Sequence, residues 1–151
     1  MKNRTPEGEI LTDLIVEVFR VNGSLLDAGN QLTRPFGLTS ARWQVLGAIE
    51  LAGQALTVSQ IARRMGLARQ GVQRIVNDLV QLGLVALKPN LDHKRAALVS
   101  LTVKGRKTLA KVGAAQADWV NELSNGFNQR QLTQAVKLLK LVREKTEKQE
   151  L

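Results

Sequence analysis

Residues 57–77 read TVSQIARRMGLARQGVQRIVN, and the fold is most clearly indicated here. Within it, Ala62, Gly66 and Val72 stand at the spacing expected where one helix turns sharply onto another. The alanine lets the two helices approach, the glycine can adopt a positive φ in the turn, and the valine is suited to burial. The stretch therefore predicts a helix-turn-helix.

The second helix of this motif is predicted over residues 68–81, and it divides into two faces at the helical period. The apolar face consists of Val72, Ile75, Val76 and Leu79. The polar face holds amide and guanidinium groups and no carboxylate: Gln70, Gln73, Arg74 and Asn77, with Arg69 in the first turn. Gln and Asn can bridge adenine N6 and N7, Arg can bridge guanine O6 and N7, and an α-helix fits the major groove. The alternative is a merely solvated polar face, but the turn signature before it favours DNA readout.

The first helix of the motif begins at a capping box, in which Thr57 and Gln60 satisfy backbone donors reciprocally. Thr57 and Ser59, at this helix start, belong to the predicted DNA-binding set. Charge supports this set, because residues 57–107 hold ten basic and two acidic residues, a net of +8 out of the chain's +9. A polyanion attracts such a segment and releases counterions on binding.

A basic hairpin is predicted directly after the motif. Gly83 ends the second helix, and residues 84–88 and 96–101 predict two short strands joined by the turn-prone PNLDHKR. The basic residues of the hairpin are Lys88, His93, Lys94 and Arg95. A basic hairpin beside a recognition helix predicts a wing, with Arg95 in a minor groove and the lysines near phosphates. Arg95 could instead pair with Asp92 across the loop, and the two roles are compatible.

Three stretches carry a resemblance to a known family: LTSARWQVLGAI, LTVSQIARRMGLARQGVQRIVNDLVQLGLV and DHKRAALVSLTVKG. In this order they resemble the MarR family of winged-helix transcriptional regulators over essentially the whole chain. The resemblance implies a mainly α fold with a small β-hairpin wing, and a homodimer that binds a pseudopalindromic operator in double-stranded DNA. Many relatives are repressors released by small aromatic or phenolic ligands, whereas others sense thiol oxidation or metal.

The implied organisation is a single domain over residues 1–151. Its winged-helix part covers about 36–103, and dimerisation helices cover about 8–32 and 104–148. Two positions depart from the family pattern. Ala68 stands where members commonly have Ser or Thr capping the recognition helix, and His93 stands two residues before Arg95, where members commonly have Asp.

Long helices are predicted outside the motif. Apolar residues recur at helical spacing from Ile10 to Leu26, Thr102 caps a later helix, and Asn128 with Gln131 indicates a capped final helix. Such helices could complete a monomeric core, but the resemblance favours dimerisation. The predicted dimer interface contains Ile10, Leu14, Leu132, Val136 and Leu139.

A middle helix is predicted over residues 39–51, at the junction where family members often hold a ligand. The predicted pocket residues are Phe19, Arg20, Phe36, Arg42 and Trp43. The aromatic side chains could border a small aromatic effector, and the arginines could pair with its carboxylate. The alternative for the aromatics is an ordinary place in the core.

Composition limits the other function classes. With 151 residues and 44% hydrophobic composition, the chain can bury the core of one domain. The absence of cysteine excludes disulfides and thiol-based sensing, and the single His93 is expected to be solvated or to contact phosphate, so no cofactor or metal is expected. No segment predicts a membrane span or a secretory signal, so we expect a cytoplasmic protein.

An enzyme is not expected either. The sequence shows no P-loop, Rossmann glycine pattern or nucleophile elbow, and a hydrolase triad would have to take His93 from the basic hairpin. The alternative to a sequence-specific regulator is a basic helical module that binds an acidic protein, or DNA without regard to sequence. Such a module would tolerate loss of Gln70, Gln73 and Asn77.

Overall fold

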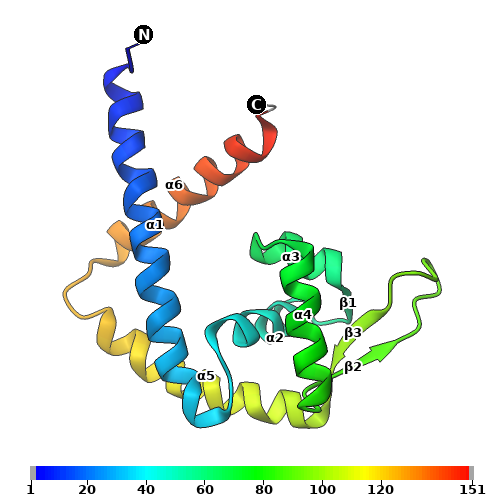
Figure 1. The fold of residues 1–151 in the computed structure, drawn as a ribbon. Helices are drawn as coiled ribbons and strands as arrows, with labels where there is room; N and C mark the ends of the chain where they lie inside the picture. The colour runs from blue at the N-terminus through cyan, green and yellow to red at the C-terminus, as the bar shows by residue number, and fades with distance from the viewer. Residues whose placement is uncertain (1–2, 150–151) are drawn as a thin grey trace. The chain divides into compact units, whose positions relative to one another are not determined.

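The computed structural model describes residues 3–149, which fall into two compact units divided after Ala115. The elements of the first unit, in chain order (Figure 1), are α1 (Pro6–Thr33), the 3-10 helix η1 (Arg34–Phe36), α2 (Ser40–Ala52), β1 (Leu56–Thr57), α3 (Val58–Met65), α4 (Arg69–Gln81), β2 (Val85–Lys88), β3 (Leu98–Leu101) and the first part of α5 (Val103–Leu123). The second unit contains the rest of α5 and α6 (Gln129–Lys148).

The helix-turn-helix has the structure that its sequence predicts. The Thr57 hydroxyl accepts from the Gln60 backbone N–H at 3.2 Å, and the Gln60 side chain accepts from the Thr57 backbone N–H at 2.9 Å. α3 ends at Met65, and its C-cap residue Gly66 has a φ of +64°, which is strained for other residues. Ala62 and Val72 are buried in the core, and α4 packs against α3.

The wing belongs to a sheet of three antiparallel strands in the order β1-β3-β2. The sequence predicts only the hairpin of β2 and β3, because a two-residue strand such as β1 has no periodicity to detect. The second strand of the hairpin is also predicted to begin two residues too early, at residue 96 instead of Leu98. Ala96 N–H donates to the His93 carbonyl at 3.1 Å, so the turn continues through Ala96 and β3 begins at Leu98.

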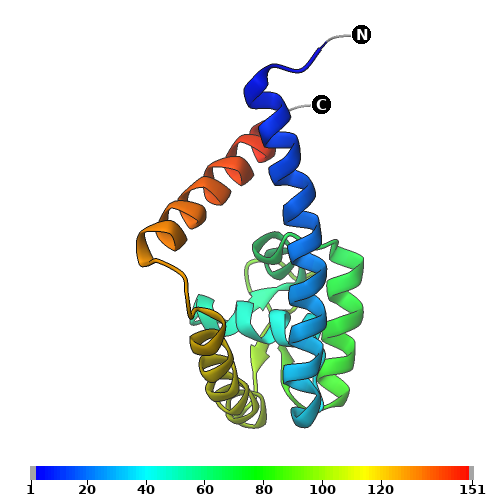
Figure 2. The same cartoon turned by 90° about the vertical axis from the view of Figure 1, so that its left-hand side faces the viewer.

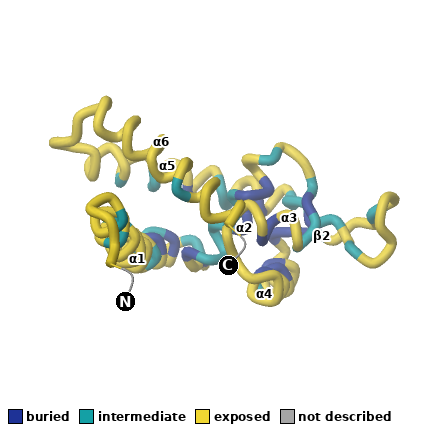
Figure 3. Tube along the Cα trace, turned by 90° about the horizontal axis from the view of Figure 1, so that it is seen from above, coloured by how far each residue is buried: buried dark blue, intermediate teal, exposed yellow. Residues whose placement is uncertain are grey.

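The core lies in the first unit, where α2, α3 and α4 pack on one another and on the sheet (Figure 3). Its largest fully buried side chains include Leu46, Leu56, Ile61, Leu79 and Val99. α1 packs against α2 along its C-terminal part, where Gly29 and Thr33 are buried. This compact core fixes the positions of the helix-turn-helix and the base of the wing.

The long helices begin close to where the caps predict. α1 starts at Pro6, two residues before the predicted start, because Thr5 accepts from the Gly8 N–H at 3.1 Å and proline suits the first helical turn. The Thr102 hydroxyl accepts from the Gly105 N–H at 3.0 Å. α6 begins with the predicted capping box of Asn128 and Gln131. Each cap is local, so the sequence reveals it.

Apolar side chains remain exposed on the long helices. α1 extends past the packed elements of the first unit (Figure 2), and Ile10, Ile15 and Phe19 are exposed on it. In the second unit, none of the residues of α6, all of which the structure describes, is buried. Within residues 3–149, no helix combines the length and apolar character needed to cross a membrane.

Candidate nucleic-acid interface

α4 presents the two faces that its sequence predicts. Val72, Val76 and Leu79 are fully buried, and Ile75 is packed against the same core. The opposite face is exposed to solvent: Arg69, Gln70, Gln73, Arg74 and Asn77. The apolar face therefore holds the helix in place while the amide and guanidinium groups remain available to base edges.

Two of the predicted base-reading side chains contact each other. Gln73 Nε2 donates to Asn77 Oδ1 at 3.0 Å, one helical turn apart. This hydrogen bond orients both side-chain amides in the absence of DNA. The oxygen of Gln73 and the amide nitrogen of Asn77 keep hydrogen-bonding capacity for base edges.

α4 begins without a side-chain cap. Ala68 is the N-cap residue, with φ −69° and ψ 136°, and no side chain accepts from the first backbone N–H groups. The first turn of α4 also contains no acidic residue. Because Ala68 stands where family members commonly have Ser or Thr, no side chain at the start of α4 accepts from its first backbone N–H groups.

A hollow of about 160 Å³ brings together DNA-binding candidates from three separate segments. Thr57 and Ser59 come from the start of α3, Arg69 and Gln73 from α4, and Arg95 from the wing loop. The hairpin side chains that line this hollow are Leu87, Ala96, Ala97 and Val99. Residues predicted independently from the motif and from the wing therefore meet at one surface.

The two faces of the wing differ. Leu87 pairs with Val99 in the sheet and both line this hollow, whereas Lys88 pairs with Leu98 one position along. Because side chains alternate across a strand, Lys88 lies on the face of the hairpin that points away from the hollow. His93 and Lys94 are exposed in the loop. The sequence could not separate Lys88 from the other wing cations, because the register of β2 on β3 decides its direction.

Arg95 does not pair with Asp92. No ion pair within 4.0 Å joins these two side chains, both of which lie among the described residues 3–149. The Asp92 N–H instead donates to the Asn90 side chain at 3.1 Å, which shapes the loop as a turn. The guanidinium of Arg95 is therefore not neutralised by the nearest acid in sequence.

α4 contains one acid, Asp78, and the structure pairs it with Arg42 of α2 at 3.2 Å. The sequence places Arg42 in a ligand pocket and gives no signal of this contact between residues 36 positions apart. The pair links α2 to α4 and offsets a carboxylate that would repel phosphates. Since Asp78 is half-exposed, we expect the pair to contribute at most about 1 kcal/mol to stability.

The remaining pocket candidates occupy two kinds of environment. Phe36 and Trp43 are half-buried and pack against the core. Phe19 and Arg20 are exposed on α1, where Arg20 approaches Glu17 at 3.7 Å. Of the dimer candidates, Leu14 is half-buried, while Ile10, Leu132, Val136 and Leu139 are exposed.

These features define a winged helix-turn-helix protein of the DNA-binding class. The model of the MarR family matches residues 36–96, which run from the last residue of η1 to Ala96 in the wing loop. The chain belongs to the MarR family, whose members are transcription regulators and not enzymes.

Two relatives and one solved structure show what this chain is similar to. An uncharacterized protein of Mycobacterium tuberculosis is 44% identical over 99 residues, which cover 66% of this chain and 68% of that protein. The HTH-type transcriptional regulator TcaR of Staphylococcus aureus is 31% identical over 91 residues, which cover 59% of this chain and 60% of TcaR. The crystal structure of the M. tuberculosis regulator MosR in complex with DNA has a similar fold, with a TM-score of 0.72 at 24% identity, covering 87% of this chain and 96% of MosR.

Proposed function

We propose that this regulator is a homodimeric repressor that binds a pseudopalindromic operator. Each protomer places α4 in a major groove, and the two recognition helices lie about 34 Å apart, one turn of DNA. The wings contact the flanking minor grooves through Arg95, and Lys94 contacts phosphates.

The observation that carries this proposal is the exposed polar face of α4 beside the wing. Gln73 and Arg69 line the same hollow as Arg95, so base-reading groups and a groove-reading arginine are presented together. The side chains opposite them are fully buried, which fixes the orientation of α4. If the polar face of α4 were merely exposed to solvent, there would be no reason for a basic hairpin beside it.

Exposed apolar side chains support the dimer. On α1 they include Ile10 and Phe19, and on α6 they include Leu132, Val136 and Leu139. Leu132, Val136 and Leu139 follow one another at spacings of four and three residues and so lie on one face of α6. Exposed apolar faces are typical of protein interfaces, because their burial is favourable by about 25 cal/mol per Å². A dimer also explains a pseudopalindromic operator, since the symmetry of the protein is matched by that of the DNA.

We further propose that a small aromatic or phenolic ligand releases the repressor, as the family resemblance implies. Phe36 and Trp43 supply aromatic surface at the edge of the core, and both contact the winged-helix core directly. A ligand that prefers a dimer with altered spacing between its recognition helices must lower DNA affinity by linkage.

The test of the proposed function is selection of bound duplexes from a random pool at physiological salt, followed by sequencing. The expected result is an inverted repeat with half-sites about one turn apart. Binding without enrichment of any sequence would contradict the proposal and favour a nonspecific architectural module.

Three variants then assign the contacts. Arg74→Ala should relax one base position and cost about 1–3 kcal/mol of operator binding. Lys94→Ala should weaken all DNA alike and flatten the salt dependence. Arg63→Ala is the matched control, because Arg63 is an exposed arginine of α3 outside the polar face of α4. Unchanged base preference in Arg74→Ala would remove that residue from base readout.

A further inference from the structure

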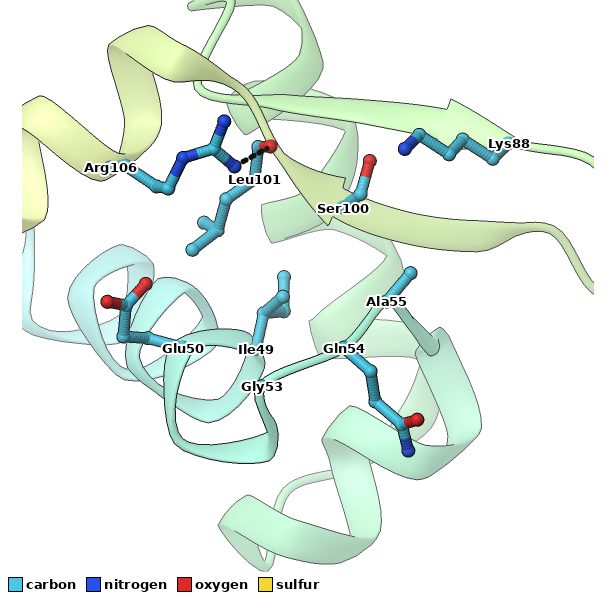
Figure 4. A pocket seen from close by; sticks show the side chains of 9 residues that line it. All are labelled: Ile49, Glu50, Gly53, Gln54, Ala55, Lys88, Ser100, Leu101 and Arg106. Carbon is cyan, nitrogen blue, oxygen red and sulfur yellow. Dashed lines mark hydrogen bonds between the residues drawn. The ribbon is translucent and has the colours of Figure 1, made fainter.

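Side chains around the DNA-binding surface are held by two kinds of acceptor. At the base of the wing, Arg106 donates to the backbone carbonyl of Leu101 at 3.0 Å, which the dashed line in Figure 4 marks. On the polar face of α4 the acceptor is another side chain, because Gln73 Nε2 donates to Asn77 Oδ1 at 3.0 Å. A substitution can therefore remove the acceptor of Gln73, whereas it cannot remove that of Arg106.

The pair of Gln73 and Asn77 differs from the other side-chain pairs of the molecule. Among residues 3–149, the other hydrogen bonds between two side chains all join an arginine to a carboxylate. Gln73 and Asn77 are both uncharged and both exposed, one helical turn apart. Water could solvate either amide about as well, so the bond contributes little to folding. Its consequence is for what α4 presents to DNA.

The bond leaves Gln73 with one donor and one acceptor for a base. A side-chain amide is planar and has one oxygen and two N–H groups, and Asn77 takes one N–H. Adenine presents its N6 donor and its N7 acceptor side by side in the major groove, and an amide pairs with both through its oxygen and one N–H. Gln73 can therefore bind adenine while its other N–H stays on Asn77.

Guanine differs from adenine at the atom that the Gln73 oxygen would meet. It presents O6 and N7 in the major groove, and both are acceptors. A freely rotating amide can turn its N–H groups toward them. In Gln73 this rotation would exchange Nε2 for Oε1 beside Asn77 Oδ1, which places two acceptors against each other. The orientation of Asn77 therefore opposes pairing of Gln73 with guanine.

We propose that Asn77 is a positioning residue that makes Gln73 select adenine over guanine. Gln73 pairs with the base edge, and Asn77 acts through its hydrogen bond to Gln73 without reading a base itself. This role rests on the proposed function, because it requires α4 to lie in the major groove. It assigns an adenine to the operator position that faces Gln73 in each half-site.

The test measures binding of the full chain to matched duplexes. The probes are the duplex enriched from the random pool and a set in which each A·T pair is replaced in turn by G·C. At one position in each half-site, the replacement should weaken wild-type binding by about tenfold or more. Gln73→Ala identifies this position, because the affinities for the two duplexes should become equal there.

Variants of Asn77 separate positioning from base readout. Asn77→Ala removes the acceptor and should lower the preference for the A·T duplex at this position by about three- to tenfold, the worth of one neutral hydrogen bond. Asn77→Asp keeps an acceptor that cannot become a donor when ionised, so it should keep the wild-type preference. The added negative charge weakens binding of both duplexes alike and cancels in the ratio.

The matched control is Gln81→Ala. Gln81 is an exposed amide of the same helix, one turn beyond Asn77, and its loss should leave the preference unchanged. A second measurement needs no DNA. In the wild type, 15N relaxation of the side-chain NH2 groups should show Gln73 more ordered than Gln81, and in Asn77→Ala the two should be equally mobile. Backbone spectra that match the wild type away from each substitution establish that the variants are folded.

Three results would overturn the role of Asn77: an unchanged preference in Asn77→Ala, an equal order of the Gln73 amide in Asn77→Ala and the wild type, or a loss in Asn77→Asp as large as in Asn77→Ala. The last result would make Asn77 a base-reading residue. Failure of the proposed function looks different. If the selection enriches no sequence, the proposed function and this role are both wrong. If it enriches an inverted repeat and Asn77→Ala keeps the preference, only this role is wrong.

Discussion

α4 and α6 are both amphipathic, but the chain buries the apolar face of only one of them. In α4, Val72, Val76 and Leu79 are fully buried in the core of the first unit. In α6, Leu132, Val136 and Leu139 remain 43–51% exposed. The same helical pattern thus serves two purposes: α4 is positioned by its own chain, and α6 presents an apolar surface that the proposed dimer would cover.

The largest expected effect comes from emptying the core under α4. Leu79→Ala should lower the free energy of unfolding by about 2–5 kcal/mol, because the removed methyl groups leave a cavity in packed surroundings. Denaturant unfolding measures the change. A loss below about 1 kcal/mol would mean that α4 is not held by burial, and the contrast with α6 would disappear.

The next effect concerns the contact between the start of α5 and the α4–β2 turn. A Cβ on Gly105 would overlap the carbonyl oxygen of Leu84, so Gly105→Ala should cost about 1–3 kcal/mol of unfolding free energy. Gly113→Ala on the same helix is the control. No heavy atom lies within 4 Å of its added Cβ, so it should stabilise the helix by up to about 1 kcal/mol. Equal effects of the two substitutions on thermal unfolding would contradict this contact.

The exposed face of α6 should matter for association rather than for folding of the protomer. Leu139→Gln should raise the dimer dissociation constant by about tenfold, or about 1.4 kcal/mol, because the amide must be buried in place of an apolar side chain. Analytical ultracentrifugation over a concentration series measures this. Lys137→Gln changes an exposed polar residue two positions before Leu139 on the same helix. It should leave the dimer dissociation constant unchanged. A shift of similar size in both variants would show that α6 does not associate through its apolar face.

The smallest effect is a gain at the start of α4. Ala68→Ser supplies the missing cap, because Ala68 already has the extended backbone of an N-cap residue. We expect the free energy of unfolding to rise by about 0.5–2 kcal/mol in denaturant titrations. A destabilised variant would mean that the start of α4 is constrained by something other than its backbone donors.

Local patterns account for the parts of this fold that the sequence predicts well. The turn at Gly66, the capping boxes at Thr57 and Asn128, and the two faces of α4 each depend on residues within one or two helical turns. The wing strands are predicted less accurately, because the loop between them sets where β3 begins. β1 is missed altogether, since two residues acquire strand geometry only by pairing with β3.

The helix-turn-helix, its caps and the chemistry of its exposed face can be read from the sequence, because side-chain periodicity and backbone capping are short-range effects. The contacts between distant segments arise only when the chain is folded. Folding joins Arg42 to Asp78 and turns Lys88 away from the hollow that holds Arg69 and Arg95. Those relations depend on strand register and on the packing of α2 against α4 and the sheet, and no local pattern in the sequence encodes either.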